Sequence, residues 1–336
     1  ELTLNDGKCL LTGKQFGLKT GTLESHSDFT SFEKAFGKQI DHLVKKMILA
    51  CAAVERCHQS HLPSPFLSGV VEDCLETGKD VTAGGAKYNF SGIQAIQVAN
   101  IADSLAVLKK LVFDGNLVKK ETMLNALKNN FAGDEPLRQL CINKIPKYGN
   151  DIDWVDNLGA KWITYFSNKL KKFKNFRGGS FSMGLYTVSA HVPMGQNVGA
   201  TPDGRLSQTP LADGGMSPMY GRDQQGPTAV LNSVSRIPSH LAGNGTLLNM
   251  KFLPSFFNNE QDREKFTSLL KSFTYLPVHH IQFNVVTSEE LIKAKADPES
   301  YRGLTIRVAG YTAYFTELAG DLQDEIIRRT THGENN

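Results

Sequence analysis

The stretch from Thr305 to Ala313 holds the residues of this chain whose types and spacing could support unusual chemistry. It places apolar and β-branched residues around Gly310, together with Arg307 and Tyr311. Apolar runs of this kind are typical of a buried strand, in which a glycine marks a bulge or a close backbone approach. The chemical alternative is that Gly310 itself reacts. A glycine α-carbon radical has no side chain to twist it from planarity, and its spin can spread over both flanking amide groups. We expect such a glycine to be shielded by bulky neighbours near the tip of a buried turn.

A second segment with chemical potential is the expected strand at residues 280–286. Its alternation places His280, Gln282 and Asn284 on one face and three apolar side chains on the other. Polar side chains on one face of a strand deep in a domain require partners, such as another polar element, water or a ligand. We interpret His280, and also His191, as structural residues.

The five cysteines provide no recognisable metal or disulfide framework. Their number is odd, they are scattered, and none is part of a Cys-x-x-Cys pair. His58 and His61 are three residues apart, but no carboxylate or third ligand is near, so we interpret them as residues of a helix end. The pattern predicts no metal site and a reducing compartment, with the cytoplasm as the default. The cysteines are Cys9, Cys51, Cys57, Cys74 and Cys141.

Composition describes a globular protein with no strong electrostatic preference. The chain has 336 residues, 40% hydrophobic and 21% charged, with a net charge of +3. It is long enough to form one large domain or two ordinary ones. The small net charge gives no argument for nucleic acid or an anionic membrane. No apolar run of about 18 residues is present, so we expect no membrane-spanning segment and no membrane partner.

The elements that must position these residues alternate between helices and buried strands. This alternation predicts an α/β architecture, most simply a barrel-like one. Residues 177–223 are dense in Gly, Pro, Asp and Ser, and a long ordered stretch of that composition tends to be functional. Helices are expected near residues 30–59, 93–113, 120–131, 136–144, 153–174, 226–237 and 259–273, and strands near residues 181–192, 246–253 and 280–286.

Several motifs together resemble the glycyl radical enzymes, the superfamily of pyruvate formate-lyase and the anaerobic diol dehydratases. The segment Arg307–Phe315, which reads Arg-Val-Ala-Gly-Tyr-Thr-Ala-Tyr-Phe, resembles the radical-bearing loop of that superfamily. The continuation at residues 318–330 resembles its C-terminus. Further resemblance lies in the glycine-rich stretch, and the likeness extends over essentially the whole chain. The motifs there are Pro202-Asp203-Gly204-Arg205, Pro210-Leu211-Ala212-Asp213-Gly214 and Ser217-Pro218.

The resemblance implies a fold, a radical and a partner. The fold would be part of a ten-stranded β/α barrel with a buried C-terminal glycine loop. Residues 1–206 would be the C-terminal part of the barrel domain, and residues 207–336 the glycine radical domain. A radical S-adenosylmethionine activase would remove a hydrogen from Gly310 after translation, and no cofactor would stay bound. The glycyl radical would then convert a cysteine to a thiyl radical that attacks a small-molecule substrate. A homodimer is also expected, whereas nucleic acid is not an expected partner.

The sequence departs from the family at the cysteine that such a radical would use. The family carries it in a Gly-Cys-x-Glu motif, and no cysteine here follows a glycine. We therefore expect this chain to be the C-terminal portion of a longer enzyme, inactive alone, with the cysteine in a missing N-terminal half. The alternative is a non-catalytic replacement for a damaged radical domain or an assembly partner of a larger enzyme.

The branch of the family is indicated less directly. The segment from Ala313 to Leu318 resembles the dehydratase, decarboxylase and lyase branches more than pyruvate formate-lyase itself. Tyr186 lies in a segment that resembles the lining of the substrate cavity, although an ordinary core tyrosine fits the same pattern. Arg329 could close over that cavity or pair with an acidic neighbour. Tyr186 and Arg329 are therefore the expected substrate-lining residues.

Overall fold

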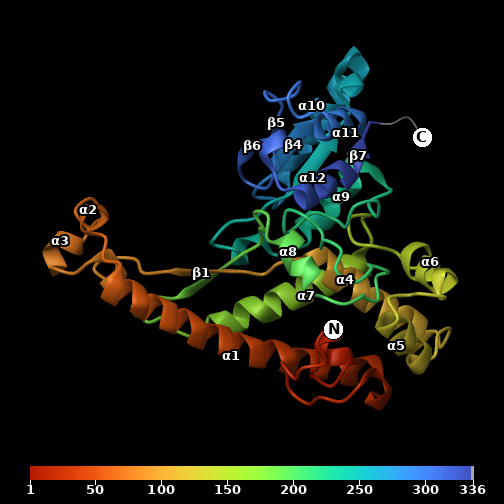
Figure 1. Ribbon diagram of the computed structural model, residues 1–336, viewed down its shortest axis with the longest axis horizontal. Coiled ribbons are helices and arrows are strands. Elements are labelled where there is room, and N and C mark those ends of the chain that lie inside the picture. Colours follow the sequence, from red (N-terminus) through yellow and green to blue (C-terminus); the bar gives the residue numbers. More distant parts are fainter. Residues whose placement is uncertain (334–336) are drawn as a thin grey trace.

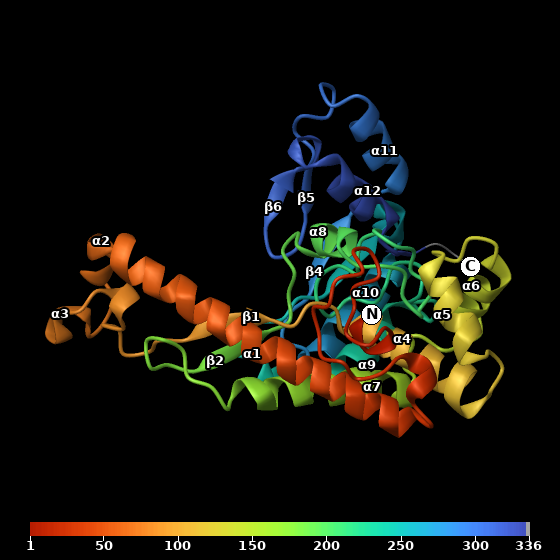
Figure 2. The same ribbon diagram turned by 60° about the horizontal axis from the view of Figure 1, so that its bottom comes forward.

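The fold consists of one long helix, a set of shorter helices and three small sheets. The computed structural model describes residues 1–333. Figure 1 shows α1 along one side of the molecule, with α2 and α3 at its far end. The C-terminal elements gather on the opposite side in both views (Figures 1 and 2). The α-helices are α1 (Phe29–His61), α2 (Pro65–Ser68), α3 (Cys74–Thr77), α4 (Val98–Val107), α5 (Lys120–Lys128), α6 (Glu135–Asn143), α7 (Asp153–Leu170), α8 (His191–Gln196), α9 (Gly226–Ser235), α10 (Glu260–Tyr275), α11 (Ser288–Ala296) and α12 (Gly320–Arg328).

The strands form separate sheets of two, three and two strands. β1 pairs with β2 in parallel, β4, β3 and β7 form a parallel sheet in that order, and β5 and β6 form an antiparallel hairpin. The expected mixed α/β class is thus confirmed, whereas a barrel is not seen in the part of the chain that the structure describes. The strands are β1 (Ser91–Gln94), β2 (Phe181–Gly184), β3 (Asn249–Phe252), β4 (Gln282–Val285), β5 (Thr305–Arg307), β6 (Thr312–Tyr314) and β7 (Thr331–His332).

Short helical turns complete the chain. Residues Leu108–Asp114 continue α4 as a π-helix, η4. The remaining short elements are 3₁₀-helices, which lie in connections between the longer elements. They are η1 (Leu2–Leu4), η2 (Leu23–Ser25), η3 (Val81–Ala83), η5 (Ser239–Leu241), η6 (Pro254–Phe257) and η7 (Phe315–Glu317).

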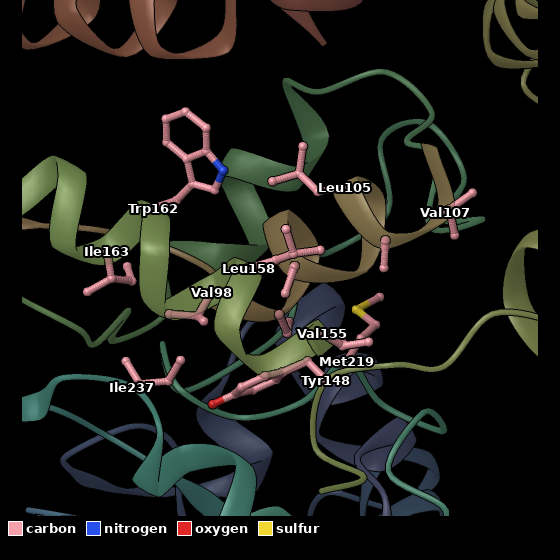
Figure 3. Packing of buried hydrophobic residues seen from close by; sticks show 14 of the residues in the cluster. Val98, Leu105, Val107, Tyr148, Val155, Leu158, Trp162, Ile163, Met219 and Ile237 are labelled. Atoms are coloured by element: carbon pink, nitrogen blue, oxygen red, sulfur yellow. The ribbon is translucent and has the colours of Figure 1, made fainter. Parts of the chain in front are cut away.

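The main hydrophobic core lies where α4 packs on α7. Val98 and Leu105 of α4 meet Leu158 and Trp162 of α7 in a buried apolar cluster (Figure 3). These side chains recur at the three- and four-residue spacing that gives a helix one apolar face. The Trp162 ring also receives the edge of Phe36 from α1, with ring centroids 4.5 Å apart. The aromatic stripe of α7 therefore fixes the long helix α1 to the body of the protein.

A second, smaller core lies between α11, the β5–β6 hairpin and α12. It is separate from the main core. The C-terminal elements therefore have an apolar interior of their own, which Val192 of α8 joins from the preceding part of the chain. The buried members of this core are Val192, Val286, Leu291, Ala294, Ile306, Val308, Phe315, Leu322 and Ile326.

Most expected helices and two expected strands are confirmed. The helices near residues 30–59, 120–131, 136–144, 153–174, 226–237 and 259–273 correspond to α1, α5, α6, α7, α9 and α10. The strands near residues 246–253 and 280–286 correspond to β3 and β4. Their apolar patterns are long and unbroken, which is where sequence periodicity is most informative.

Two expected elements are wrong in part. The helix predicted from Ile93 begins only at Val98, because Ile93 belongs to β1 and Gln97 has a left-handed φ of +82° that no helix accommodates. The strand predicted over residues 181–192 ends at Gly184. Val188 has a φ of +54° in the turn that follows, and His191 already belongs to α8. Apolar composition alone could not reveal either backbone reversal.

Candidate functional site

Gly310 lies in the turn of the β5–β6 hairpin, not in a bulge within one strand. Ile306 faces Ala313 and Arg307 faces Thr312 across the hairpin, and Val308 donates a backbone hydrogen bond to the Tyr311 carbonyl at 2.9 Å. Gly310 has a φ of +86°, which a residue with a Cβ adopts only with strain. The simple strand interpretation of residues 305–313 is therefore wrong, and the local turn explains why a glycine is present.

Gly310 is exposed in the described chain, although we expected it to be shielded. Val308 and Ala309, which precede it, are buried, whereas the glycine at the tip faces the surface. Val308 of the hairpin belongs to the second core together with Leu291 of α11 and Leu322 of α12, so apolar residues surround the base of the loop. The expected bulky shield is therefore present on one side of the loop only.

An open cavity of about 390 Å³ lies beside Gly310. It brings together the glycine, Tyr311 and Tyr186, which are three of the residues predicted from sequence. Tyr186 accepts a hydrogen bond at its hydroxyl from Asn244 at 3.3 Å. None of the five cysteines lines this cavity. The lining consists of Tyr186, Val188, Thr246, Leu247, His280, Ala309, Gly310 and Tyr311.

The polar face of β4 binds the backbone of the hairpin. The Gly310 N–H donates to Gln282 Oε1 at 3.0 Å. The Arg307 N–H donates to Asn284 Oδ1 at 2.9 Å, and Asn284 Nδ2 donates back to the Arg307 carbonyl at 2.8 Å. Gln282 and Asn284 are each only 5% exposed. The prediction that this polar face needs partners is confirmed, and the partner is the glycine loop itself.

Arg307 and His280 lie near the glycine loop, Arg307 on the hairpin and His280 on the wall of the cavity. The Arg307 guanidinium donates to Thr312 Oγ1 at 3.1 Å, so its side chain follows the hairpin. His280 is partly buried, and this burial together with the nearby charge of Arg307 lowers the pKa of its imidazole. A neutral imidazole is therefore favoured on the wall of the cavity.

Arg329 lies in a buried cluster of charges beneath the loop and does not line the cavity beside Gly310. Its guanidinium donates to both carboxylate oxygens of Glu325, at 3.0 and 2.9 Å, and to the Val308 carbonyl at 2.9 Å. Asp213 lies 3.4 Å from Arg329, and His191 lies 3.0 Å from Glu325. Of the two possibilities for Arg329, the structure therefore shows the pairing with an acidic neighbour.

The ionisation of this cluster follows from its geometry. Burial would raise the pKa of Glu325, but the charge of Arg329 and the contact with His191 outweigh it and hold that pKa at about 2. Burial would likewise lower the pKa of Arg329, and the two carboxylates reverse the effect and raise it. Glu325 and Arg329 are thus both charged at neutral pH, in a bidentate pair that fixes the position of Val308.

Three participants in these networks were missed at the sequence level. Glu325 stands four residues before Arg329 on a helix, and this spacing alone could have indicated the pair. Asp213 lies in the Pro210–Gly214 motif, but nothing local shows what it binds. Asn249 on β3 gives no signal, since its partners are far away in sequence.

The described residues contain no group of three or more His, Cys, Asp or Glu side chains arranged to hold a metal ion. All five cysteines are free, and Cys74 and Cys141 are buried. Within residues 1–333, no helix is both long and apolar enough to cross a bilayer.

Fold and site together define a mixed α/β protein with a C-terminal glycine loop whose backbone is held by the polar face of a strand. Comparison with known families then gives the family. Residues 1–195 match the model described as Pyruvate formate lyase-like, and residues 212–316 match the model described as Glycine radical. The chain belongs to the pyruvate formate lyase-like family of glycyl radical enzymes.

Individual relatives agree with this assignment. The chain is 38% identical over 330 residues to trans-4-hydroxy-L-proline dehydratase of Clostridioides difficile, covering 98% of this chain and 42% of the relative. It is 37% identical over 335 residues to (2S)-3-sulfopropanediol dehydratase of Klebsiella oxytoca, covering 98% and 40%. The solved glycerol-bound B12-independent glycerol dehydratase from Clostridium butyricum superposes with a TM-score of 0.94 at 43% identity, covering 98% and 42%. This chain thus spans about two fifths of the length of these relatives.

Proposed function

We propose that Gly310 carries the glycyl radical of an anaerobic dehydratase or related lyase, and that this chain is its radical-storing part. The observation that carries the proposal is the placement of Gly310. It is a glycine with a φ of +86° at the exposed tip of a hairpin whose backbone is held by Gln282 and Asn284. It also lies inside the region that matches the Glycine radical model.

The proposed chemistry is a sequence of hydrogen-atom transfers. A radical S-adenosylmethionine activase removes one hydrogen atom from the Gly310 α-carbon. The glycyl radical later takes a hydrogen atom from a cysteine thiol, which restores Gly310 and leaves a thiyl radical. The thiyl radical takes a hydrogen atom from the substrate and returns it after the rearrangement. The glycine serves as the stable store because its spin is shared with two amide groups.

The cysteine of this sequence is proposed to lie outside the chain described here. No cysteine in the chain follows a glycine, and none lines the cavity beside Gly310. The chain spans only about two fifths of its relatives, so the remaining part has room for such a residue. We therefore expect no substrate turnover by the isolated, activated chain. Turnover by that preparation would refute this part of the proposal.

The proposed division of the chain places residues 1–206 in a barrel domain and residues 207–336 in a glycine radical domain. Parallel pairing supports the barrel, because β1–β2 is extended by a parallel bridge between Leu185 and Thr246, just before β3. The separate core under the hairpin supports the second unit. The barrel would close with strands from the rest of the enzyme, and we propose that the enzyme assembles as a homodimer.

The proposed substrate class is a small polar molecule that loses a C–O bond. The relatives described above are named as dehydratases, and the cavity beside Gly310 is lined by Tyr186, whose hydroxyl accepts a hydrogen bond from Asn244. We propose Tyr186 as a substrate contact. A contact between Arg329 and substrate is not proposed, since its donors are engaged with Glu325 and Val308.

Anaerobic activation followed by electron paramagnetic resonance tests the proposal. We expect an organic radical signal split by one α-proton, and the splitting should collapse when the protein contains α-deuterated glycine. Gly310→Ala should give no signal, whereas Gly303→Ala should keep it, because a methyl at Gly303 meets nothing within 4 Å. Air should then cleave the activated parent chain at Gly310. An intact chain after air exposure, or a radical in the Gly310→Ala variant, would contradict the assignment.

A further inference from the structure

The N–H group of Gly310 has one buried side-chain partner. Gln282 Oε1 accepts this hydrogen bond at 3.0 Å, and the two residues are far apart in the chain, on the β4 strand and on the hairpin tip. Gly310 itself is exposed, but Gln282 is only 5% exposed. The N–H of Gly310 therefore contacts a buried polar side chain, while the glycine also lines the open cavity.

The orientation of the Gln282 amide is fixed by a chain of hydrogen bonds. Its Nε2 donates to Asn249 Oδ1, so its oxygen is directed at Gly310. Asn249 cannot reverse its own amide, because its Nδ2 donates to Asp213 and to the Val308 carbonyl. A carboxylate and a carbonyl only accept, and this sets the direction of every bond in the chain. The network extends from Asp213 through Asn249 and Gln282 to the Gly310 N–H.

We propose that Gln282 is a positioning residue for the stored radical, which it tunes through the Gly310 nitrogen. This inference rests on the proposed function. In a glycyl radical the amide nitrogen donates electron density to the α-carbon and the carbonyl withdraws it. An acceptor on the N–H makes the nitrogen a better donor and restricts rotation of the peptide plane that precedes Gly310. Both effects favour planarity and wider sharing of the spin.

Asn284 provides a matched control on the same strand face. It is 5% exposed, as Gln282 is, and it also bonds the hairpin backbone. Its partner is Arg307, three residues before the glycine, through both the N–H and the carbonyl. A loss of general hairpin anchoring would thus appear in variants of either residue. A change at the Gly310 nitrogen should appear only in variants of Gln282.

The test uses two variants of Gln282. Gln282→Met keeps the side-chain size and removes the acceptor, whereas Gln282→Glu, as the protonated acid, keeps an acceptor toward Gly310 and a donor toward Asn249 Oδ1. The first readout is hydrogen exchange of the Gly310 amide in the full chain, which needs no radical. We expect exchange to be about tenfold faster in Gln282→Met, in line with the loss of one hydrogen bond. It should stay near the parent rate in Gln282→Glu. Asn284→Ala should accelerate exchange at Arg307 and leave Gly310 near the parent rate.

The second readout is the radical itself, formed by the activase with ¹⁵N-glycine in the protein. Gln282→Met should change the nitrogen hyperfine coupling and shorten the anaerobic lifetime of the signal, while Asn284→Ala and Gln282→Glu keep the parent coupling. An unchanged exchange rate of the Gly310 amide in Gln282→Met would show that the hydrogen bond to Gln282 does not hold the glycine, and would overturn the proposal. Faster exchange with a parent-like coupling and lifetime would overturn the tuning role alone. Absence of any radical in the parent would instead refute the proposed function, and the tuning role with it.

Discussion

Replacing Arg329 with methionine should strongly destabilise the C-terminal unit. Arg329 is 6% exposed and Glu325 is 1% exposed, so the change leaves a buried carboxylate without its bidentate partner. Breaking a buried ion pair by removing one member costs about 3–5 kcal/mol. The Val308 carbonyl also loses its donor, which adds about 1 kcal/mol. This is a large share of a typical unfolding free energy of about 5–15 kcal/mol.

The double variant Arg329→Met with Glu325→Leu separates charge burial from packing. It removes both ions, and replacement of a buried pair by apolar residues is often close to neutral. We therefore expect it to be more stable than Arg329→Met by about 3–5 kcal/mol, which is the cost of the unpaired Glu325 carboxylate and a clear departure from additivity. Arg302→Met is the matched control, since Arg302 pairs with Glu299 on the surface, where both side chains are about three quarters exposed. Its cost should be below about 1 kcal/mol.

Two measurements test these predictions. Denaturant unfolding of the full chain gives the free energy of unfolding of each variant, and hydrogen exchange reports on the peptide that contains Val308 and Phe315. The exchange readout is needed because parts of a protein can open locally at different free energies, and the second core is distinct from the main one. We expect faster exchange in this peptide for Arg329→Met and a parent-like rate for Arg302→Met. Two results would refute the reasoning: equal losses in the two single variants, or a double variant no more stable than Arg329→Met.

Three further predictions concern other sites. Burial raises the pKa of Asp223 to about 7, so the folded state holds a proton that the unfolded state releases above about pH 4. Asp223 should therefore make stability fall as pH rises from about 4 to 7, by up to about 1.4 kcal/mol per pH unit, and unfolding titrations of Asp223→Asn should lack this component. Thr287→Ala should cost about 1 kcal/mol in denaturant unfolding, because Thr287 Oγ1 accepts the Glu290 N–H of α11 at 3.0 Å. Gly179→Ala would place a methyl 1.7 Å from the Asn89 carbonyl oxygen, so a loss of about 1–3 kcal/mol in the same assay is expected.

The helical part of the fold was predictable because its signals are local. α7 shows an uninterrupted apolar stripe, and its expected and observed starts coincide at Asp153. The errors arose where one residue adopts an unusual backbone conformation. Gln97 and Val188 have positive φ values, which their residue types do not suggest. The parallel pairing of β1 with β2 joins residues about 90 apart in sequence, and a single chain's pattern does not encode such a register.

The site was predictable in its parts but not in its connections. The alternation at residues 280–284 correctly indicated a polar face whose side chains require hydrogen-bond partners, since a period-2 pattern gives the face on which each side chain lies. The partner is the Gly310 loop, 28 residues away, and no local rule brings the two together. His191 and Glu325 likewise meet only in the folded chain. The exposure of Gly310 in the described chain also depends on the whole tertiary structure, which no local pattern encodes.

The polar attachment of the hairpin explains how a single backbone atom can be held in place. Apolar packing is non-directional, so the second core alone would tolerate small shifts of the loop. Hydrogen bonds to Gln282 and Asn284 have fixed donors and acceptors, and a displaced loop would leave those buried groups unsatisfied at about 1–3 kcal/mol each. The Val308 carbonyl is fixed in the same way by Arg329. Directional contacts on both sides of residues 307–310 therefore define the position of Gly310 while its α-carbon stays open to the cavity.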